Sequence, residues 1–487
     1  MRSLKLGEIA ASIGAASVDP AVASVEARGV ATDSRQIRSG ALFWALIGER
    51  HDGHEFVGQA LAAGAIAAVV SRGFVGEGPL LRVPDTKRAL GQFAAWYRRS
   101  WSGTVIAVTG SVGKTSTREA IYAVLSQRWP GVRSIKNFNN EIGVPLSLLQ
   151  VGPEHEFAVM ELGASGPGEI ARLAEIAGPQ IGVLTAIGPV HLEGFGSLEG
   201  VARAKSELIA ALGDTGTAVL NADDPWVRVI GDTARCRVAW FGTGQRVQGS
   251  GFRVQGSEFK VQRSMFSVQS SDVWGHSIEV AGETVSFRFG GGRRVTLQAP
   301  GRHQVYAALA AGAVGRCLGM DDEEIAAGLE SYRSPAMRCQ VERLGEVTVI
   351  NDAYNASPPS MWAALDLLGN WQTEGRRVLV CGDMMELGPA EVHWHRRLGQ
   401  EIAQRRWLDR CVAVGPLSAK VVEEARRTGM SPGSISHCDS AGQACVVLKQ
   451  IVRDGDVVLV KGSRAMQLED TVQGLREWLN AGVQALA

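Results

Sequence analysis

The chain has 487 residues, and its 50 lysines and arginines balance 50 acidic residues, so the formal net charge is zero. A chain of this length exceeds what one hydrophobic core supports and predicts two to four domains. Without net charge no global field attracts nucleic acid or anionic membranes, so neither partner is expected. The sequence has no long uninterrupted apolar run, so no membrane span is expected either.

Cysteine usage and the first residues indicate the compartment. The seven cysteines are scattered and form no Cys-x-x-Cys pair, which fits a reducing environment. Residues 1–17 carry Glu8 within their only apolar stretch and make a poor signal peptide. We therefore expect a cytoplasmic protein.

Residues 1 to about 100 have the pattern of a small α/β unit. Three segments read as short strands: 40–46, 65–70 and 80–83. Two segments have helical spacing: one that Asp52 or His54 can start and that ends near 63, and 85–99. Between them, Asp33-Ser34-Arg35 is open to two interpretations, a capped turn with a surface salt bridge or part of a ligand site. The pattern alone favours the turn.

A glycine-rich turn dominates the next region. Four apolar residues, 105–108, predict a buried strand, and 118–125 has helical spacing. Between them stands Gly-x-x-Gly-Lys-Thr, a short variant of the phosphate-binding loop, at 110–115. Glycines let backbone N–H groups face a phosphate, the helix start adds positive potential, and the lysine reaches the terminal phosphates. The sequence therefore predicts a nucleotide site with Mg²⁺ on the threonine hydroxyl.

Polar residues recur at strand ends in the same region, which we expect to extend to about 331. Glu161 closes a strand at 157–160, and His191 follows a strand at 181–186. A carboxylate in such a place suits a metal ion near a phosphate loop. Lys205 falls in a helix expected at 198–212, where the pattern alone favours an exposed lysine paired with a neighbouring acid. Three asparagines gather in a loop before a helix: Asn137, Asn139 and Asn140.

The stretch 236–300 has short alternating segments separated by glycines, including 252–254 and 285–289. These predict antiparallel hairpins appended to the central domain. A helix follows from Gly301-Arg302-His303 to about 318.

From about 332 to 487, strands and helices alternate. Strands are expected at 347–350, 378–381, 411–414 and 457–460. Polar residues follow them, such as Asp352 and Asp383, and a segment at 461–464. This predicts a parallel sheet with helices on both faces, and ligands beyond the carboxyl ends of its strands. We expect the site to lie between domains.

Two motifs carry a resemblance to a known family. The loop at 109–115 and the segment Asn-Asp-Ala-Tyr-Asn-Ala-Ser-Pro at 351–358, followed by Ser360-Met361, resemble the Mur ligases, ATP-dependent amide ligases of peptidoglycan synthesis. The resemblance covers the whole chain. It implies a UDP-sugar-peptide domain (1–100), a central P-loop ATPase-like domain (101–331) and a Rossmann-like domain that closes over ATP (332–487). The second motif is similar to that of members adding D-alanyl-D-alanine to UDP-N-acetylmuramoyl-tripeptide.

The resemblance implies roles for individual residues. Those expected to act in catalysis are Lys114, Glu161, His191, Lys205, Arg338 and Asp352. Those expected to bind ATP are Gly110, Ser111, Gly113, Lys114, Thr115, Ser116, His303, Gln304, Arg338 and Asp352. Two Mg²⁺ ions are expected, one on Thr115 and Glu161, the other on His191 and a carbamate on Lys205. Those expected to bind substrate are Ser34, Arg35, Asp52, His54, Asn137, Asn139, Asn140, Tyr354, Asn355 and Ser357.

Two positions depart from the family pattern. Gln304 and Ala307 stand where asparagines are common, and Ser357 replaces an asparagine in the second motif. The first departure concerns the adenine contact, the second only fine positioning.

The resemblance implies that the tripeptide carboxylate is first converted to an acyl phosphate, and that the dipeptide amine then attacks this acyl phosphate. The protein is expected to be a monomer. Two alternatives stay open: another Mur-type or folylpolyglutamate-type ligase, and a non-catalytic nucleotide-binding scaffold.

Overall fold

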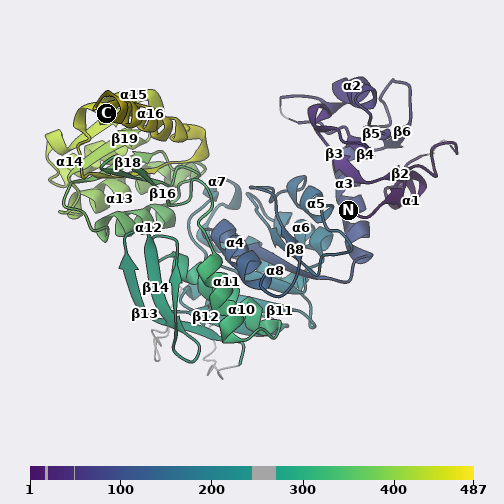
Figure 1. Cartoon of the computed structure of the whole chain (residues 1–487), viewed down its shortest axis with the longest axis horizontal. Helices are drawn as coiled ribbons and strands as arrows, with labels where there is room; N and C mark the ends of the chain where they lie inside the picture. The colour runs from purple at the N-terminus through teal and green to yellow at the C-terminus, as the bar shows by residue number, and fades with distance from the viewer. Residues whose placement is uncertain (17–19, 49, 244–269, 487) are drawn as a thin grey trace.

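The computed structural model describes residues 1–16, 20–48, 50–243 and 270–486. These residues form three α/β bodies, each built around one main sheet, and Figure 1 shows the first and third on either side of the central one. The expected α/β class is confirmed. Among the described helices, none combines the length and apolarity needed to cross a bilayer. The hairpin segment expected at 252–254 lies outside the described residues.

The first body holds a parallel four-stranded sheet in the order β3-β4-β5-β6, beside a two-stranded antiparallel pair, β1-β2. The strands are β1 (Leu4–Lys5), β2 (Glu26–Ala27), β3 (Gly29–Ala31), β4 (Ala41–Trp44), β5 (Ala67–Ser71) and β6 (Leu80–Val83). The helices are α1 (Leu6–Ser12), α2 (Val57–Ala62) and α3 (Thr86–Arg99). Asp52, one of two expected helix starters, caps the 3₁₀ turn Gly53–Phe56 that leads into α2.

The central body is a nine-stranded sheet in the order β15-β14-β13-β12-β11-β10-β7-β9-β8. Its strands are β7 (Thr104–Thr109), β8 (Gly131–Arg133), β9 (Phe157–Glu161), β10 (Ile181–Leu184), β11 (Thr217–Asn221), β12 (Arg237–Gly242), β13 (Val273–Ala281), β14 (Thr284–Phe289) and β15 (Arg293–Leu297). Strands β13, β14 and β15 pair antiparallel, as the alternation at 285–289 predicts. They are no separate layer, because β13 pairs with β12 and continues the parallel sheet.

Helices cover both faces of this sheet. They are α4 (Lys114–Leu125), α5 (Gly143–Leu148), α6 (Glu169–Ala177), α7 (Leu192–Phe195), α8 (Leu198–Ala211), α9 (Pro225–Asp232), α10 (Gln304–Cys317) and α11 (Asp322–Ser331). Alternate residues of β7 feed two cores: Ile106 and Val108 pack toward α4, α10 and α11, Val105 and Ala107 toward α5, α6 and α8. The second core runs on into α3, which fastens the first body to the centre.

The third body is a six-stranded sheet in the order β16-β17-β21-β18-β19-β20, parallel except for β16. Its strands are β16 (Gln340–Leu344), β17 (Val347–Asn351), β18 (Arg377–Gly382), β19 (Arg410–Val414), β20 (Ile435–Cys438) and β21 (Val457–Lys461). Its helices are α12 (Pro358–Gly369), α13 (Glu391–Gln404), α14 (Ser418–Arg427), α15 (Ala441–Ile451) and α16 (Glu469–Leu486). Separate cores on the two faces confirm the expected coverage of both sides.

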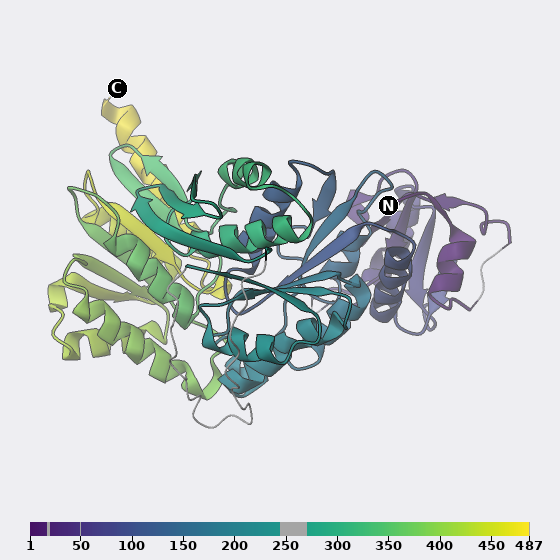
Figure 2. The same ribbon diagram turned by 90° about the horizontal axis from the view of Figure 1, so that it is seen from below.

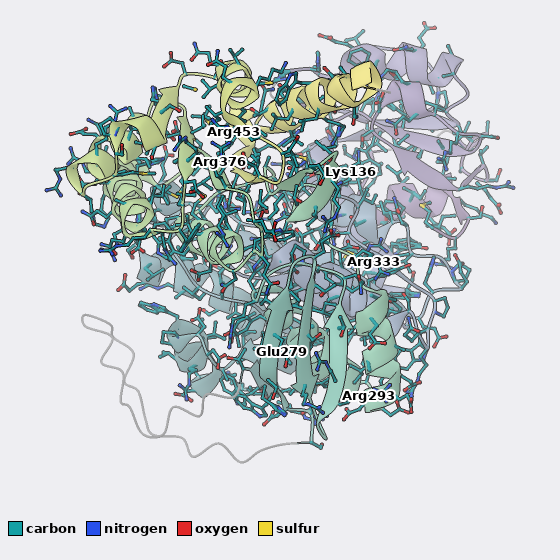
Figure 3. The ribbon with its side chains drawn as sticks, turned by 60° about the vertical axis from the view of Figure 1, so that its left-hand side comes forward. Lys136, Glu279, Arg293, Arg333, Arg376 and Arg453 are labelled. Carbon is teal, nitrogen blue, oxygen red and sulfur yellow. The ribbon has the colours of Figure 1, made fainter. Side chains whose placement is uncertain are left out.

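Ion pairs lie at both ends of the parallel strands of the third sheet. At the amino edge, where the parallel strands begin, Arg376 pairs with Asp456 at 2.7 Å. The Arg453 backbone N–H donates to the same carboxylate, so Asp456 has its partners within this body. Figure 3 shows both arginines on the third body, while Glu279 and Arg293 lie on the antiparallel strands. The carboxyl edge carries Asp352 and Lys461 and lines a cavity. Figure 2 shows the central body between the other two. The same cavity is lined by Lys114 and Glu161 of the central body, so this edge faces the phosphate loop.

Candidate active site

The glycine-rich turn has the backbone that the motif predicts. Gly110 has φ 144°, and a Cβ there would lie 2.0 Å from Thr185 Oγ1. Gly113 has φ 82° and directly precedes α4. A side chain at Gly110 would clash, and both backbones favour glycine. The loop therefore passes closely over β10 and delivers Lys114 at the start of a helix.

Lys114 folds back over this loop. Its Nζ donates to the Gly110 carbonyl at 2.8 Å and lies 3.4 Å from the Ser111 carbonyl. Burial lowers the pKa of the Lys114 ammonium, and Glu161 nearby opposes that shift. The ammonium thus stands where the terminal phosphates of a nucleotide would lie over the loop.

Glu161 is the buried carboxylate of the site, at 2 % exposure. One oxygen accepts from Thr115 Oγ1 at 2.9 Å and faces Arg118 Nη1 at 3.2 Å. The other accepts from Asn139 Nδ2 at 3.0 Å. The strand end, the helix start and the asparagine loop therefore converge on one carboxylate.

A cavity of about 780 Å³ extends from this carboxylate to the third body. Most residues expected in the site line it: Ser111, Gly113, Lys114, Thr115, Ser116, Asn137, Asn139, Asn140, Glu161, His191, His303, Gln304, Arg338, Asp352, Tyr354, Asn355 and Ser357. Six expected residues are not in its lining: Gly110, Lys205, Ser34, Arg35, Asp52 and His54. The expectation of a cleft between domains thus agrees with the geometry.

On the cavity wall that the third body contributes, charged side chains are held by an ion pair and a cation–π contact. Lys461 Nζ pairs with Asp352 Oδ2 at 2.7 Å, and the Cys339 N–H donates to Oδ1 at 3.2 Å. The Arg338 guanidinium lies 4.1 Å from the centre of the Tyr354 ring, a cation–π contact that fixes the arginine. Asp352 and Arg338 thus have defined positions on the cavity wall.

Gln304 occupies the position where the family pattern commonly has asparagine. It is 1 % exposed, and its carbonyl accepts from the Tyr332 hydroxyl at 3.1 Å. His303 beside it contacts the Cys339 sulfur through Nε2, and burial lowers the pKa of His303. Both ends of the Gln304 amide therefore have internal neighbours, because its nitrogen also lies 3.4 Å from His303 Nε2.

His191 is the N-cap residue of α7 and has a left-handed backbone conformation with φ 48°. Its Nδ1 is buried and lies against the Glu386 carboxylate, but makes no well-aligned hydrogen bond among the described residues. The imidazole lowers the pKa of the Glu386 carboxyl. A residue of the central body thus meets a carboxylate of the third body on the cavity wall.

Lys205 is buried at 1 % exposure, so the interpretation as a surface lysine is wrong. Its Nζ donates to the Ala164 carbonyl at 3.3 Å and lies 5.2 Å from the Phe195 ring centre. The neighbouring acid Glu207 does not pair with it but accepts two backbone N–H groups at the start of α6. Burial, with a smaller contribution from Lys114, lowers the pKa of Lys205 to about 7. Ala164 lines the cavity, which puts this amine directly behind the wall.

The residues expected at the UDP end are satisfied within the first body. Arg35 pairs with Asp33 through two nitrogens at 2.9 and 2.8 Å, with its side chain 81 % exposed. The His54 ring binds Asp52 through Nδ1, and its Nε2 accepts from the Ser71 backbone at 2.9 Å. Ser34 donates to Gln59 at 3.0 Å. The capped turn with a surface pair, one of the two interpretations of this segment, is present.

Arg118 and Glu386 were not expected in the site from the sequence, and Lys461 was expected only as part of the polar segment 461–464 that follows a strand. Arg118 is 3 % exposed and also donates to the Lys136 carbonyl at 2.5 Å, which ties α4 to the asparagine loop. Lys461 had a signal, because it follows an expected strand in a parallel sheet. Arg118 and Glu386 had none, since each depends on a partner distant in sequence or on burial.

The donors present suit Mg²⁺ at one point of the wall. Thr115 Oγ1 and Glu161 Oε2 are hard oxygens 2.9 Å apart, beside the phosphate loop. Within the described ranges, no group of three or more His, Cys, Asp or Glu side chains is placed to hold a metal. This agrees with the usual binding of Mg²⁺ by one or two carboxylates together with substrate phosphates.

Fold and cavity define an α/β protein with a phosphate loop facing a third, Rossmann-like body. Three family models match: "Mur ligase family, catalytic domain" (26–98), "Mur ligase middle domain" (108–315) and "Mur ligase, glutamate ligase domain" (337–464). The chain belongs to the Mur ligase family.

Individual relatives sharpen this assignment. The UDP-N-acetylmuramoyl-tripeptide–D-alanyl-D-alanine ligase of Escherichia coli is 36 % identical over 92 % of this chain and 93 % of its own length. The enzyme of the same name from Bacillus subtilis is 35 % identical, with the same coverage. MurF from Acinetobacter baumannii superposes with a TM-score of 0.84 at 31 % identity, covering 98 % of this chain and 99 % of that one. MurF from Thermotoga maritima, solved with ADP, has a TM-score of 0.77 at 28 % identity, over 93 % and 98 %.

Proposed function

We propose that the chain is an ATP-dependent ligase that joins D-alanyl-D-alanine to UDP-N-acetylmuramoyl-tripeptide through an amide bond. The observation that carries the proposal is the single cavity in which the phosphate loop, Glu161 and the Asp352–Lys461 pair face one another. The relatives of 30–36 % identity bear this activity in their names. Folylpolyglutamate synthase, at 16 % identity, shares only the fold and lends no support to that alternative.

The reaction has two steps. The tripeptide carboxylate attacks the γ-phosphorus of ATP, the bond to the β-phosphate bridging oxygen breaks, and ADP and an acyl phosphate form. The neutral dipeptide amine then attacks the acyl carbon and forms the C–N bond; the C–O bond to phosphate breaks as the tetrahedral intermediate collapses, and the proton lost from nitrogen passes to the departing inorganic phosphate. Lys114 at the loop reduces repulsion between the phosphates and the approaching carboxylate. Arg338 and Asp352 hold the nucleotide from the opposite wall.

Mg²⁺ bound at Thr115 and Glu161 would supply further neutralisation of phosphate charge. We place a second ion at His191 and at a carbamate on Lys205. An ammonium would repel a cation, whereas a carbamate offers hard oxygens. Burial lowers the pKa of Lys205 to about 7, which favours the neutral amine compared with an exposed lysine, and only the neutral amine adds CO₂.

Substrate groups are distributed over the three bodies. The UDP end lies on the first body at Ser34, Arg35, Asp52 and His54. The asparagine loop, with Asn137, Asn139 and Asn140, faces the reacting carboxylate from the cavity rim. Tyr354, Asn355 and Ser357 face the same volume from the third body and receive the dipeptide. An acyl phosphate hydrolyses readily, so closure of the third body must exclude water as the amine arrives.

We further propose that the domains divide near residues 100 and 331, and that the protein acts as a cytoplasmic monomer. The three sheets fall on either side of these divisions, which supports them.

Phosphate release tests the proposal. The purified chain receives ATP, Mg²⁺ and each of several UDP-N-acetylmuramoyl-peptides, with D-alanyl-D-alanine or with single amino acids. We expect release only with a UDP-tripeptide and the dipeptide, and a product heavier than the tripeptide by one dipeptide minus water. Release with single amino acids favours a sister ligase, and no release with any pair favours the scaffold alternative.

A further inference from the structure

A turn of the third body, from Met384 to Gly388, follows strand β18 and carries Glu386 to the cavity wall. Two buried groups hold it from behind. The Met384 N–H donates to His395 Nε2 at 3.0 Å, and the Met385 N–H donates to Ser463 Oγ at 2.9 Å. Glu386 itself has φ 64°, a left-handed conformation that is unusual for a residue other than glycine. The turn is thus fixed to its own body, and Glu386 sits at its tip.

This tip fits closely against the start of α7 in the central body. The Glu193 N–H donates to the Glu386 carbonyl at 3.4 Å, and a Cβ on Gly388 would come within 3.2 Å of Glu193 Cα. Leu192 packs against the apolar core of the third body. Figure 1 shows α7 beside the third body, apart from most other helices of the central body. The loop that bears His191 is therefore shaped by both bodies.

Energetics argue against a purely stabilising role for the His191–Glu386 contact. The side chains are 30 % and 58 % exposed, and ion pairs of that exposure contribute little to stability. Both residues are non-glycines with positive φ, a backbone conformation that is unfavourable for such residues. The weak contact therefore gives little stability to set against this backbone strain. Strained residues that persist in contact across a cavity are typical of functional positioning.

We propose that Glu386 is a positioning residue that orients the His191 imidazole toward the cavity when the third body is docked. The proposal rests on the proposed function, in which His191 binds a second Mg²⁺. An imidazole whose Nδ1 lies against a carboxylate keeps Nε2 as the ring nitrogen open to a ligand, and carboxylates commonly orient a ligating histidine in this way. His191 is then competent only when both bodies are together, which couples docking to catalysis.

The kinetic test uses E386Q, which preserves the shape of the side chain and removes its charge. The matched control is E374Q, an exposed carboxylate at the opposite, amino edge of the same sheet. We expect E386Q to lower kcat 10–100-fold, the range found for residues that orient ligands, and to leave KM for ATP and UDP-tripeptide within about twofold. The double variant E386Q/H191A should match H191A alone, because Glu386 acts through His191.

A second measurement observes the contact without turnover. In protein labelled with ¹⁵N-histidine, E386Q should shift the His191 Nδ1 resonance and E374Q should leave it unchanged, with melting temperatures within about 2 °C. Additive losses in the double variant, a normal kcat for E386Q, or an unshifted His191 resonance would overturn the proposal. If wild-type protein releases no phosphate with these substrates, the proposed function fails, and the resonance still decides whether Glu386 orients His191.

Discussion

The cavity and the first body use the same kinds of polar residue in opposite ways. Around the cavity, side chains from distant parts of the chain converge, as Thr115, Asn139 and Arg118 do on Glu161. In the first body, the two expected carboxylate pairs are local: Arg35 binds Asp33 and His54 binds Asp52, in each case two positions away.

The difference separates two kinds of site. Convergent groups in a buried cavity are costly to assemble and act in low dielectric, so losing one should affect catalysis strongly. Local pairs on an exposed turn cost little and can exchange their internal partner for a ligand, so losing one should weaken binding only. Variants in the two regions should therefore differ in which kinetic parameter changes.

The largest effect is expected for K114A. Without the ammonium over the phosphate loop, phosphate release should fall at least about 100–1000-fold, because the loop then lacks the lysine cation that stabilises the transferred group. Melting temperature should stay near the wild-type value, and K420A, an exposed lysine of α14, should turn over normally. Normal turnover by a folded K114A protein would remove the phosphate loop from the mechanism.

A similarly large loss, about 100-fold, is expected for K205A, with partial recovery when a short-chain carboxylic acid is added to the assay. The added carboxylate would replace the oxygens that a carbamate provides. Phosphate release with and without the acid measures both effects. Full activity of K205A, or failure of every small carboxylate to restore any activity, would contradict the carbamate.

Replacing Lys205 should lower activity but raise the thermal stability of the protein. The folded pKa, about 7, lies below the unfolded value near 10.5, so the folded state binds fewer protons between these values. The penalty for burying the ammonium is therefore complete below pH 7 and fades as pH rises. In CO₂-depleted buffer, K205M should melt roughly several degrees above wild type at pH 6.5, and the gain should shrink by pH 9. A gain independent of pH would indicate packing alone.

Much of this fold could be predicted because its evidence is local. The apolar runs at 105–108, 157–160 and 378–381 are buried strands, and the residues that follow them line the cavity or lie beside it. Several strands were not expected, including β8, β16 and β20, each of which lies at a sheet edge and has mixed polarity. The interior strand β11 was also not expected, although most of its residues are buried. Edge strands gain order from a neighbour's hydrogen bonds, which no local pattern reports.

The site was predictable to the extent that its residues follow strands or the glycine loop. Lys205 shows where a pattern was present but not used: Val201, Ala204 and Leu208 share its helix face, and that face is buried. Arg118 and Glu386 are different, because a charged residue on a helix or turn is ordinarily solvated. Only tertiary contact, across domains in the case of Glu386, gives them a role.

A smaller effect, confined to binding, is expected in the first body for R35A. Its exposed pair with Asp33 contributes little stability, so melting temperature should not change. A charge-assisted contact to a diphosphate is worth about 1.5–3 kcal/mol, so KM for the UDP-tripeptide should rise roughly tenfold or more. KM for ATP and kcat should stay within about twofold, as should all parameters of R99A. An equal rise of KM for the UDP-tripeptide and for ATP would show that the turn Asp33-Ser34-Arg35 has only a structural role.

The smallest effect is expected for H395Q, which tests how much His395 stabilises the Met384–Gly388 turn beside the cavity. His395 is fully buried, and its Nε2 accepts from the Met384 N–H while Nδ1 donates to the Glu391 carbonyl at 2.7 Å, so the ring is neutral. Burial lowers the pKa of His395, with Asp383 and Glu391 opposing the shift. A lowered folded pKa means that the unfolded chain binds more protons, so this contribution to stability is present near pH 7.5 and is lost as pH falls below about 6.5.

Glutamine at position 395 can accept a hydrogen bond from the same Met384 N–H and does not titrate. Wild type should therefore lose on the order of 1 kcal/mol more than H395Q between pH 7.5 and 5, seen in melting curves and in faster exchange of the Met384 amide. Equal pH dependence in both proteins would show that this histidine does not control the turn.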